Sequence, residues 1–227
     1  MSNKLVNKTI KLSLIVQIIT TLISLEGIYL PLQPKDVILT DILKLEAVVQ
    51  LIEGCFYIWM ILGSHKVDQI TPRRYIDWVI TTPTMLISTI IYFKYKEKLE
   101  NRESSIMNIN SFISTNKSNI IKIVTYNAGM LLFGFLGETN VINKYISIPL
   151  GFIFFYKSFE LIFYEYAIHS QESKLLFKFL VTLWALYGIA AMLPVVEKNI
   201  CYNILDIFSK NFYGLYIYYV IKQINPQ

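Results

Sequence analysis

The stretch NILDIFSKNFYGLYIYYVI, residues Asn203 to Ile221, decides the fold of this chain. It is apolar and long enough to cross a lipid bilayer, yet it carries Asp206 and, one helical turn later, Lys210. A charged side chain inside a membrane costs several kcal/mol, so such residues usually have a function. The acid and the lysine are four residues apart and therefore share one face of a helix. A buried lysine beside a carboxylate suggests a Schiff base to an aldehyde.

The composition of the whole chain is that of a membrane protein. Of 227 residues, 54% are apolar and 16% are charged, and the mean hydropathy is +0.47. A membrane-spanning helix needs roughly 20 apolar residues. Stretches that qualify lie at approximately 10–30, 38–62, 74–95, 119–138, 142–165, 174–195 and 200–223. We therefore predict an all-α integral membrane protein, a bundle of seven transmembrane helices that forms a single domain over residues 1–227.

One connection, approximately residues 96–118, is long and polar. The formal net charge is +5. We attribute it to basic residues in the loops, which set the orientation of the protein in the lipid bilayer, and not to a nucleic-acid site. A basic cluster in and around this loop predicts that the loop and the C-terminus are cytoplasmic and the N-terminus extracellular. Lys4, Lys8 and Lys11 favour the opposite orientation. The sequence shows no metal-ligand spacing and indicates no oligomeric state.

A second acid, Asp77, lies in the predicted third helix within RRYIDWVITTPTML. Arg74 precedes it by about one turn and Thr81 follows it by one turn, so these residues share a face. Such a ladder beside a buried lysine could hold a protonated Schiff base, or it could be an ion pair that only orders two helices. Trp184 and Tyr187 in the predicted sixth helix could enclose a flat conjugated ligand, although aromatic residues at helical spacing more often only pack.

These motifs resemble those of microbial (type 1) rhodopsins. RRYIDWVITTPTM is similar to the third-helix signature of that family, DIFSKNFYG to its seventh, WALYG to its sixth, and YIWMILG to the end of its second helix. The matches occur in the family order over essentially the whole chain. The resemblance implies all-trans-retinal, bound covalently to Lys210 as a protonated Schiff base. It also implies a photoreceptor rather than an enzyme, and an extracellular N-terminus.

The resemblance further assigns roles to individual residues. Asp77 and Asp206 would form the counter-ion pair, with Arg74 beside them. Tyr57 and Tyr187 would form hydrogen bonds near Asp206. The retinal pocket would comprise Trp78, Thr81, Thr82, Met85, Trp184 and Tyr187.

The third helix also bears on the type of transport. Outward proton pumps of this family carry a donor carboxylic acid near the cytoplasmic end of that helix. The matching position here, eleven residues after Asp77, is Ser88. Serine cannot store and supply a proton as a carboxylic acid can. This departure argues against efficient proton pumping, and the acid at Asp77 argues against a chloride pump.

Polar stripes on three predicted helices favour ion conduction. On the second helix, polar residues recur at the i, i+4 and i+7 positions of an otherwise apolar segment. Such stripes can meet in a wet seam, and acidic residues in it would favour cations. They could also be hydrogen bonds between helices, or supply a substitute proton donor. The stripes comprise Ser13 and Gln17 on the first helix, Glu46, Gln50 and Glu53 on the second, and Asn203 on the seventh.

The same features resemble group 1 viral rhodopsins, light-gated cation channels of giant algal viruses. Positions matching Ser13, Glu46, Glu53 and Asn203 are regarded as pathway or gate residues in that group. The resemblance implies a light-gated cation channel in a host-cell membrane. A light-driven outward proton pump is the alternative, and a photosensor is a third reading.

Two further expectations concern individual side chains. Glu46 and Glu53 lie outside the retinal motifs, so replacing either by glutamine should leave retinal absorption near normal. Asn127 in the predicted fourth helix is placed opposite Thr82. A polar pair at this place influences closure in related channels, so these two residues are a candidate gate between the third and fourth helices.

Overall fold

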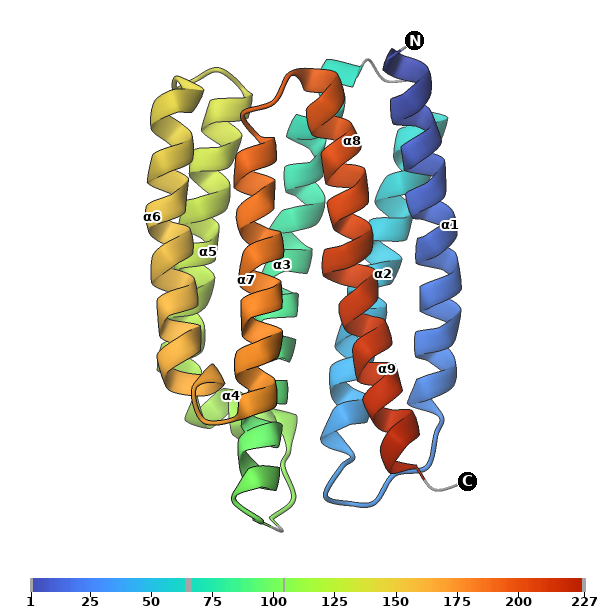
Figure 1. The fold of residues 1–227 in the computed structure, drawn as a ribbon, viewed down its shortest axis with the longest axis vertical. Coiled ribbons are helices and arrows are strands. Elements are labelled where there is room, and N and C mark those ends of the chain that lie inside the picture. Colours follow the sequence, from blue (N-terminus) through green and yellow to red (C-terminus); the bar gives the residue numbers. More distant parts are fainter. Residues whose placement is uncertain (1, 64–66, 104, 226–227) are drawn as a thin grey trace.

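The structure, a computed structural model, describes residues 2–63, 67–103 and 105–225. In this part of the chain, six helices are individually long and apolar enough to cross a membrane, and a seventh span, made of two α-helices joined by a π-helical turn, completes the bundle (Figure 1). The spans are α1 (Ser2–Ile28), α2 (Ile38–Leu62), α3 (Val67–Glu100), α5 (Lys117–Glu138), α6 (Lys144–Ile162), α7 (Gln171–Ala190), and α8 (Val195–Asp206) with α9 (Phe212–Ile224).

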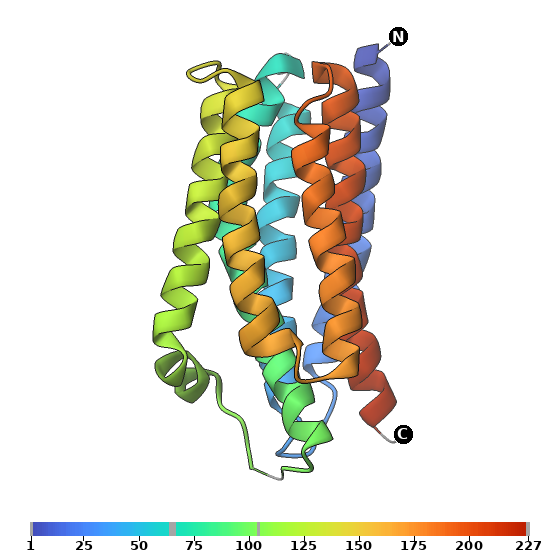
Figure 2. The ribbon, with the colours of Figure 1, turned by 60° about the vertical axis from the view of Figure 1, so that its left-hand side comes forward.

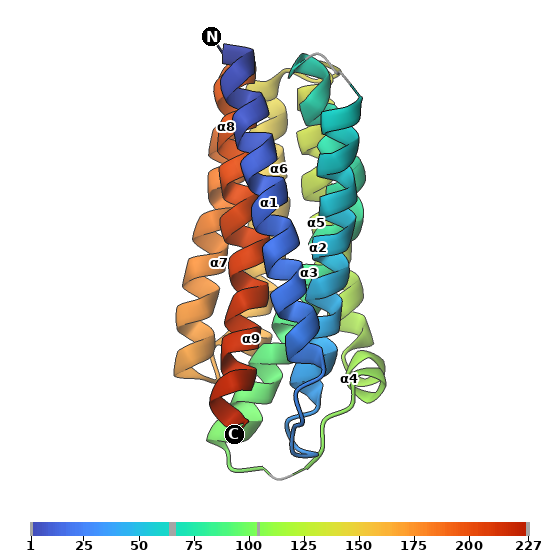
Figure 3. The same cartoon turned by 90° about the vertical axis from the view of Figure 1, so that its right-hand side faces the viewer.

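The helices form a closed ring in chain order. Each span packs against the next, and α1 closes the ring by contacting α2 on one side and α8 and α9 on the other. Figure 3 shows α1 lying across the space between α2 and the α8–α9 span. The N-terminus and the C-terminus lie at opposite ends of the bundle (Figure 1). We call these the N-terminal end and the C-terminal end.

Several helices extend beyond the apolar stretches. α1 begins at Ser2 rather than near residue 10, and α3 runs from Val67 to Glu100 rather than over 74–95. Hydropathy marks only the apolar part of a helix, whereas the segment KYKEKLE at the end of α3 contains strong helix formers. The expected loop at 96–118 is therefore shorter at its start. It also contains the short helix α4 (Ile109–Thr115), which lies at the foot of α5 (Figure 2).

The seventh span is continuous but not uniform. α8 and α9 are joined by a π-helical turn, Ile207–Asn211, in which the amide of Phe212 donates to the carbonyl oxygen of Ile207. Single π-helical turns inside α-helices occur frequently at functional sites. Lys210 lies in this turn. A second π-helical turn, Phe163–Ala167, extends α6.

The bundle presents apolar side chains on its outside and keeps most of its polar side chains inside, between clusters of apolar ones. Large apolar side chains such as Leu22, Val79 and Ile153 are more than half exposed, as expected for a surface in contact with lipid. Polar side chains face the interior, because a lipid-facing polar group has no water to bind. The predicted stripe residues are all buried: Ser13, Gln17, Glu46, Gln50, Glu53 and Asn203.

Candidate functional site

Lys210 meets three carboxylates in the middle of the bundle. Its Nζ lies 2.7 Å from Asp77 Oδ2, 3.3 Å from Glu53 Oε1 and 3.9 Å from Asp206 Oδ1. The acids come from α3, α2 and α8, and all four side chains are buried. Buried charges need partners of opposite sign. This cluster therefore holds the positive charge at Nζ among three carboxyl groups.

The two aspartates of the cluster have different surroundings. Asp206 accepts hydrogen bonds from Tyr57 at 2.6 Å, from Arg74 at 2.8 Å and from Tyr187 at 2.7 Å. Asp77 accepts from Lys210 at 2.7 Å, and its Oδ1 has no hydrogen-bond partner among the described residues. Arg74 thus pairs with Asp206 and not with the acid on its own helix. Lys210 is the main charged partner of Asp77.

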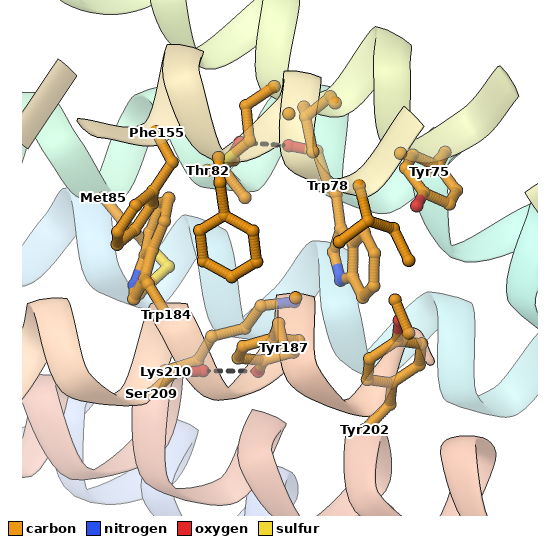
Figure 4. Close-up of a pocket in the computed structure, with 18 residues that line it drawn as sticks. Tyr75, Trp78, Thr82, Met85, Phe155, Trp184, Tyr187, Tyr202, Ser209 and Lys210 are labelled. Atoms are coloured by element: carbon orange, nitrogen blue, oxygen red, sulfur yellow. Dashed lines mark hydrogen bonds between the residues drawn. The ribbon is translucent and has the colours of Figure 1, made fainter. Parts of the chain in front are cut away.

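A mainly apolar cavity opens beside the amine of Lys210 (Figure 4). Five of the residues assigned to a retinal pocket by the resemblance line it, namely Trp78, Thr82, Met85, Trp184 and Tyr187. Thr81 does not belong to this lining, and its hydroxyl donates to the carbonyl oxygen of Asp77 at 3.0 Å. The other lining residues include Tyr75, Met130, Phe152, Phe155, Tyr202 and Ser209.

The cavity walls suit an apolar molecule with one reactive end. Rings from α3, α6, α7 and α8 form the walls, and Nζ of Lys210 points into the space between them (Figure 4). Glycines let these rings approach. A Cβ atom at Gly188 would lie 2.5 Å from Phe152, and one at Gly134 would lie 2.6 Å from the Tyr75 hydroxyl. Such walls would suit a long apolar, conjugated molecule, and the amine lies at one end of the space.

A polar seam joins α1 to α2 and to the seventh span. Ser13 donates to the carbonyl oxygen of Asn203 at 2.8 Å, and the Gln17 amide donates to the carbonyl oxygen of Gln50 at 2.9 Å. Farther along α1, Thr20 bonds to Asn211 at 2.5 Å. The seam passes the Lys210 cluster, because Asn203 also accepts from Arg74.

Several buried polar atoms of the seam have no protein partner. Among the described residues, both amide atoms of Gln50, the hydroxyl of Ser24 and Oε2 of Glu46 lack a hydrogen bond. Buried polar groups are normally paired with protein or with ordered water. Gly214 lies against Gln50, where a Cβ atom would overlap its amide nitrogen. Ordered water would satisfy these groups.

Glu46 lies beside the position at which the family's proton pumps carry their donor. Ser88 of α3 donates hydrogen bonds to Glu46 Oε1 and to the carbonyl oxygen of Met85. A carboxyl group is thus present at this depth, although it comes from α2.

The C-terminal end of the bundle is closed by tyrosines and carboxylates. Glu172 of α7 accepts hydrogen bonds from Tyr92 of α3 and from Tyr216 of α9, and it forms a 2.5 Å ion pair with Lys96. Tyr95 similarly donates to Asp36 at 2.7 Å. These contacts tie three helices together across the end of the seam. None of them was predicted, because no local pattern links residues on three separate helices.

Asn127 and Thr82 meet as the sequence suggests. The Asn127 amide donates a 2.8 Å hydrogen bond to the Thr82 hydroxyl, which itself donates to the carbonyl oxygen of Trp78 at 2.6 Å. Both side chains are buried. The pair links α5 to the wall of the cavity.

One placement differs from the sequence interpretation. Glu53 was assigned to the seam alone, yet it is also a neighbour of Lys210. Its position one turn before Tyr57, whose hydroxyl bonds to Asp206, is the only local signal of this proximity. The expectation that replacing Glu53 by glutamine leaves retinal absorption near normal is therefore inconsistent with the geometry.

Comparison with known proteins places the chain in a family. The model of the bacteriorhodopsin-like protein family matches residues 8–224, so the chain belongs to this family of microbial rhodopsins. The family implies a retinal chromophore in a multi-pass membrane protein. A comparison with curated proteins gave no match.

Solved structures agree with this assignment. The viral rhodopsin OLPVRII is 28% identical, with a TM-score of 0.81 over 97% of this chain and 99% of that chain. A blue light-absorbing proteorhodopsin from Med12 is 21% identical, with a TM-score of 0.72 over 96% and 97% of the two chains. Bromide-bound halorhodopsin from Halobacterium salinarum is 13% identical, with a TM-score of 0.72 over 99% and 98%. The last two similarities show the shared fold alone.

Proposed function

We propose that this protein is a light-gated cation channel that carries all-trans-retinal covalently on Lys210. The linkage would form between Nζ and the aldehyde carbon, with loss of water, at the end of the cavity where Nζ lies 2.7 Å from Asp77. Retinal supplies light absorption and a change of shape on isomerisation. Asp77 stabilises the positive charge on the linkage nitrogen, while Asp206 is held by Arg74 and two tyrosines.

The polar seam is the observation that carries the channel assignment. It runs along α1, α2 and the seventh span, and it contains two buried glutamates and polar atoms that lack protein partners. A cation crossing a membrane needs replacement oxygen ligands or retained water, and a carboxylate lowers its energy further. Glu46, Gln50 and Glu53 would supply these groups on one face of α2.

Two contacts would close the seam in the dark. Near the Lys210 cluster, Arg74 is bonded to both Asp206 and Asn203 and occupies the passage with a positive charge. At the C-terminal end, Glu172 ties Tyr92 to Tyr216. Conduction would require both to separate.

Orientation follows from charge and from the family resemblance. We place the N-terminal end outside and the C-terminal end, including the segment around α4, in the cytoplasm. The viral character of a 28% identical relative supports a role in a host-cell membrane.

A light-driven outward proton pump is the second candidate. The bond from Ser88 to Glu46 favours it, because it holds a carboxyl group where a pump needs a proton donor. Photocurrents recorded from whole cells at several holding voltages distinguish the two. A channel current reverses sign with voltage, whereas a pump current keeps one direction.

A further inference from the structure

An ion pair on α6 lies on the outer surface of the bundle. Nζ of Lys157 lies 3.0 Å from Oε2 of Glu160, and the two side chains are 50% and 32% exposed. Tyr156 donates a 2.9 Å hydrogen bond to the other oxygen of Glu160. All three side chains belong to a helix whose outer face is expected to contact lipid.

The depth of this pair follows from its neighbours. Phe155 lines the cavity that receives the Lys210 amine, and Lys157 follows it by two residues, which is about 3 Å along the axis. The span continues from Lys144 to Ala167. Lys157 is therefore roughly 20 Å from one end and 15 Å from the other. The pair lies near the middle of the bilayer, beyond the reach of most headgroups.

A charged pair at this depth is costly in hydrocarbon. Ionisable residues within membrane spans almost always face a bundle interior or a wet cavity. Lys44 and Asp41 also form an exposed ion pair, at 2.9 Å, but within the first two turns of α2, where headgroups and water are near. The α6 pair has no such access. Something other than lipid tails must cover it.

The residues around the pair form one stripe along α6. Ile153, Tyr156 and Tyr164 are 57%, 58% and 61% exposed. With Lys157 and Glu160 they follow spacings of three and four residues, so they share one face of the helix. The α6 stripe, defined by these five residues, thus combines apolar and aromatic area with one charge of each sign.

We propose that the α6 stripe binds the same stripe of a second copy of this chain, about a two-fold axis parallel to the membrane normal. Copies inserted in the same direction have parallel α6 helices. Lys157 of one copy then faces Glu160 of the other, with an offset of about 4.5 Å that long side chains can span. Since each stripe carries both charges, it is complementary to itself. The aromatic and apolar side chains would pack around the exchanged pairs.

Charge reversal tests the pairing directly. Donor- and acceptor-tagged full-length chains are mixed in lipid vesicles at low protein density, and energy transfer is measured with and without an excess of untagged chain. Lys157→Glu alone, or Glu160→Lys alone, should weaken association roughly tenfold or more, because like charges then meet. Mixing the two single variants, or combining both changes in one chain, should restore transfer.

Lys44→Glu is the matched control. It reverses the lysine of the exposed Lys44–Asp41 pair in the first two turns of α2, and it should leave transfer unchanged. Circular dichroism melting of each variant verifies folding. A second measurement tests the symmetry. In a background without Cys55 and Cys201, Ile153→Cys should give disulfide-linked dimers, because a two-fold axis brings equal positions together.

Three results would overturn the proposal. The first is an unmodified protein that shows no specific transfer. The second is transfer that persists in both single reversals, which would place the interface elsewhere. The third is a loss of energy transfer in the single variants without recovery on mixing, which would mean that the pair binds lipid or another protein rather than a second copy of this chain.

Discussion

The carboxylate of Glu53 lies 3.3 Å from Nζ of Lys210, although the two residues belong to different helices and to different predicted sites. Glu53 is part of the polar stripe of α2, and Lys210 is the predicted attachment point of retinal. If the positive charge on the lysine nitrogen moves or is lost, the carboxyl group of Glu53 in the seam is affected directly. In the proposed channel, this contact would link light absorption directly to conduction.

We predict that Lys210→Ala abolishes the visible absorption of protein reconstituted with retinal. The amine is the nucleophile for the linkage, and its Nζ lies beside the cavity. Lys44→Ala is the control and should keep the colour, because that lysine is 55% exposed on α2. A visible band that survives in the Lys210 variant after hydroxylamine treatment would refute the assignment.

Asp77→Asn should shift the absorption to longer wavelength while the linkage stays protonated. A nearby negative charge favours the protonated form of the linkage. When the pH is raised, the variant should therefore lose its visible band ~1–3 pH units below the pH at which the unmodified protein loses it. Spectra recorded during a pH titration measure both effects. An unchanged spectrum and titration would transfer the main counter-ion role to Asp206.

Glu53→Gln should change both the absorption maximum and the photocurrent. It replaces a carboxyl group 3.3 Å from Nζ by an amide and removes one acid of the seam at once. We expect a shift of the absorption maximum, smaller than that of Asp77→Asn, and a current reduced severalfold or lost. Glu53→Asp keeps a carboxyl group and should retain more of both properties. Normal absorption in the glutamine variant would show that Glu53 acts only in the seam and does not affect the retinal linkage.

The sequence predicts the seven spans from apolar length, and the resemblance to microbial rhodopsins predicts most of the residues around Lys210. Apolar length marks a span, and spacing of three or four residues marks a face, so the stripe that contains Glu46 and Gln50 is recognisable. Contacts between residues on different spans are harder to predict from the sequence. The closing contacts of Glu172 with Tyr92 and Tyr216 depend on how three helices end at the same level. The π-helical turn at Lys210 likewise depends on packing and not on propensity.

Thr82→Val and Asn127→Ala should alter the rate at which the current decays after light is switched off. Each change breaks the 2.8 Å hydrogen bond between α3 and α5. Thr82→Val also leaves the buried amide of Asn127 unpaired, a loss of ~1–3 kcal/mol, whereas in Asn127→Ala the Thr82 hydroxyl keeps its bond to the carbonyl oxygen of Trp78. Since both residues act through the same bond, the double variant should differ little from the single ones. Fully additive effects would show that the residues act independently.

Glu46→Gln decides between the two candidate functions. In the channel, Glu46 contributes negative charge to the seam, so the variant should change the size or cation selectivity of a current that still reverses with voltage. Absorption should stay near normal, because Glu46 contacts Ser88 and not Lys210. Ser88→Ala is the matched control, since it removes the bond but keeps the acid.

In a pump, Glu46 would instead supply the proton that returns to the linkage nitrogen. Its replacement would slow that reprotonation, with a dependence on pH, and a passive current would be absent from the start. Flash spectroscopy and voltage-clamp recording on the same variants separate these outcomes. An outward current that keeps its direction at all voltages in the unmodified protein, and that falls as reprotonation slows in Glu46→Gln, would replace the channel by a proton pump whose donor lies on α2.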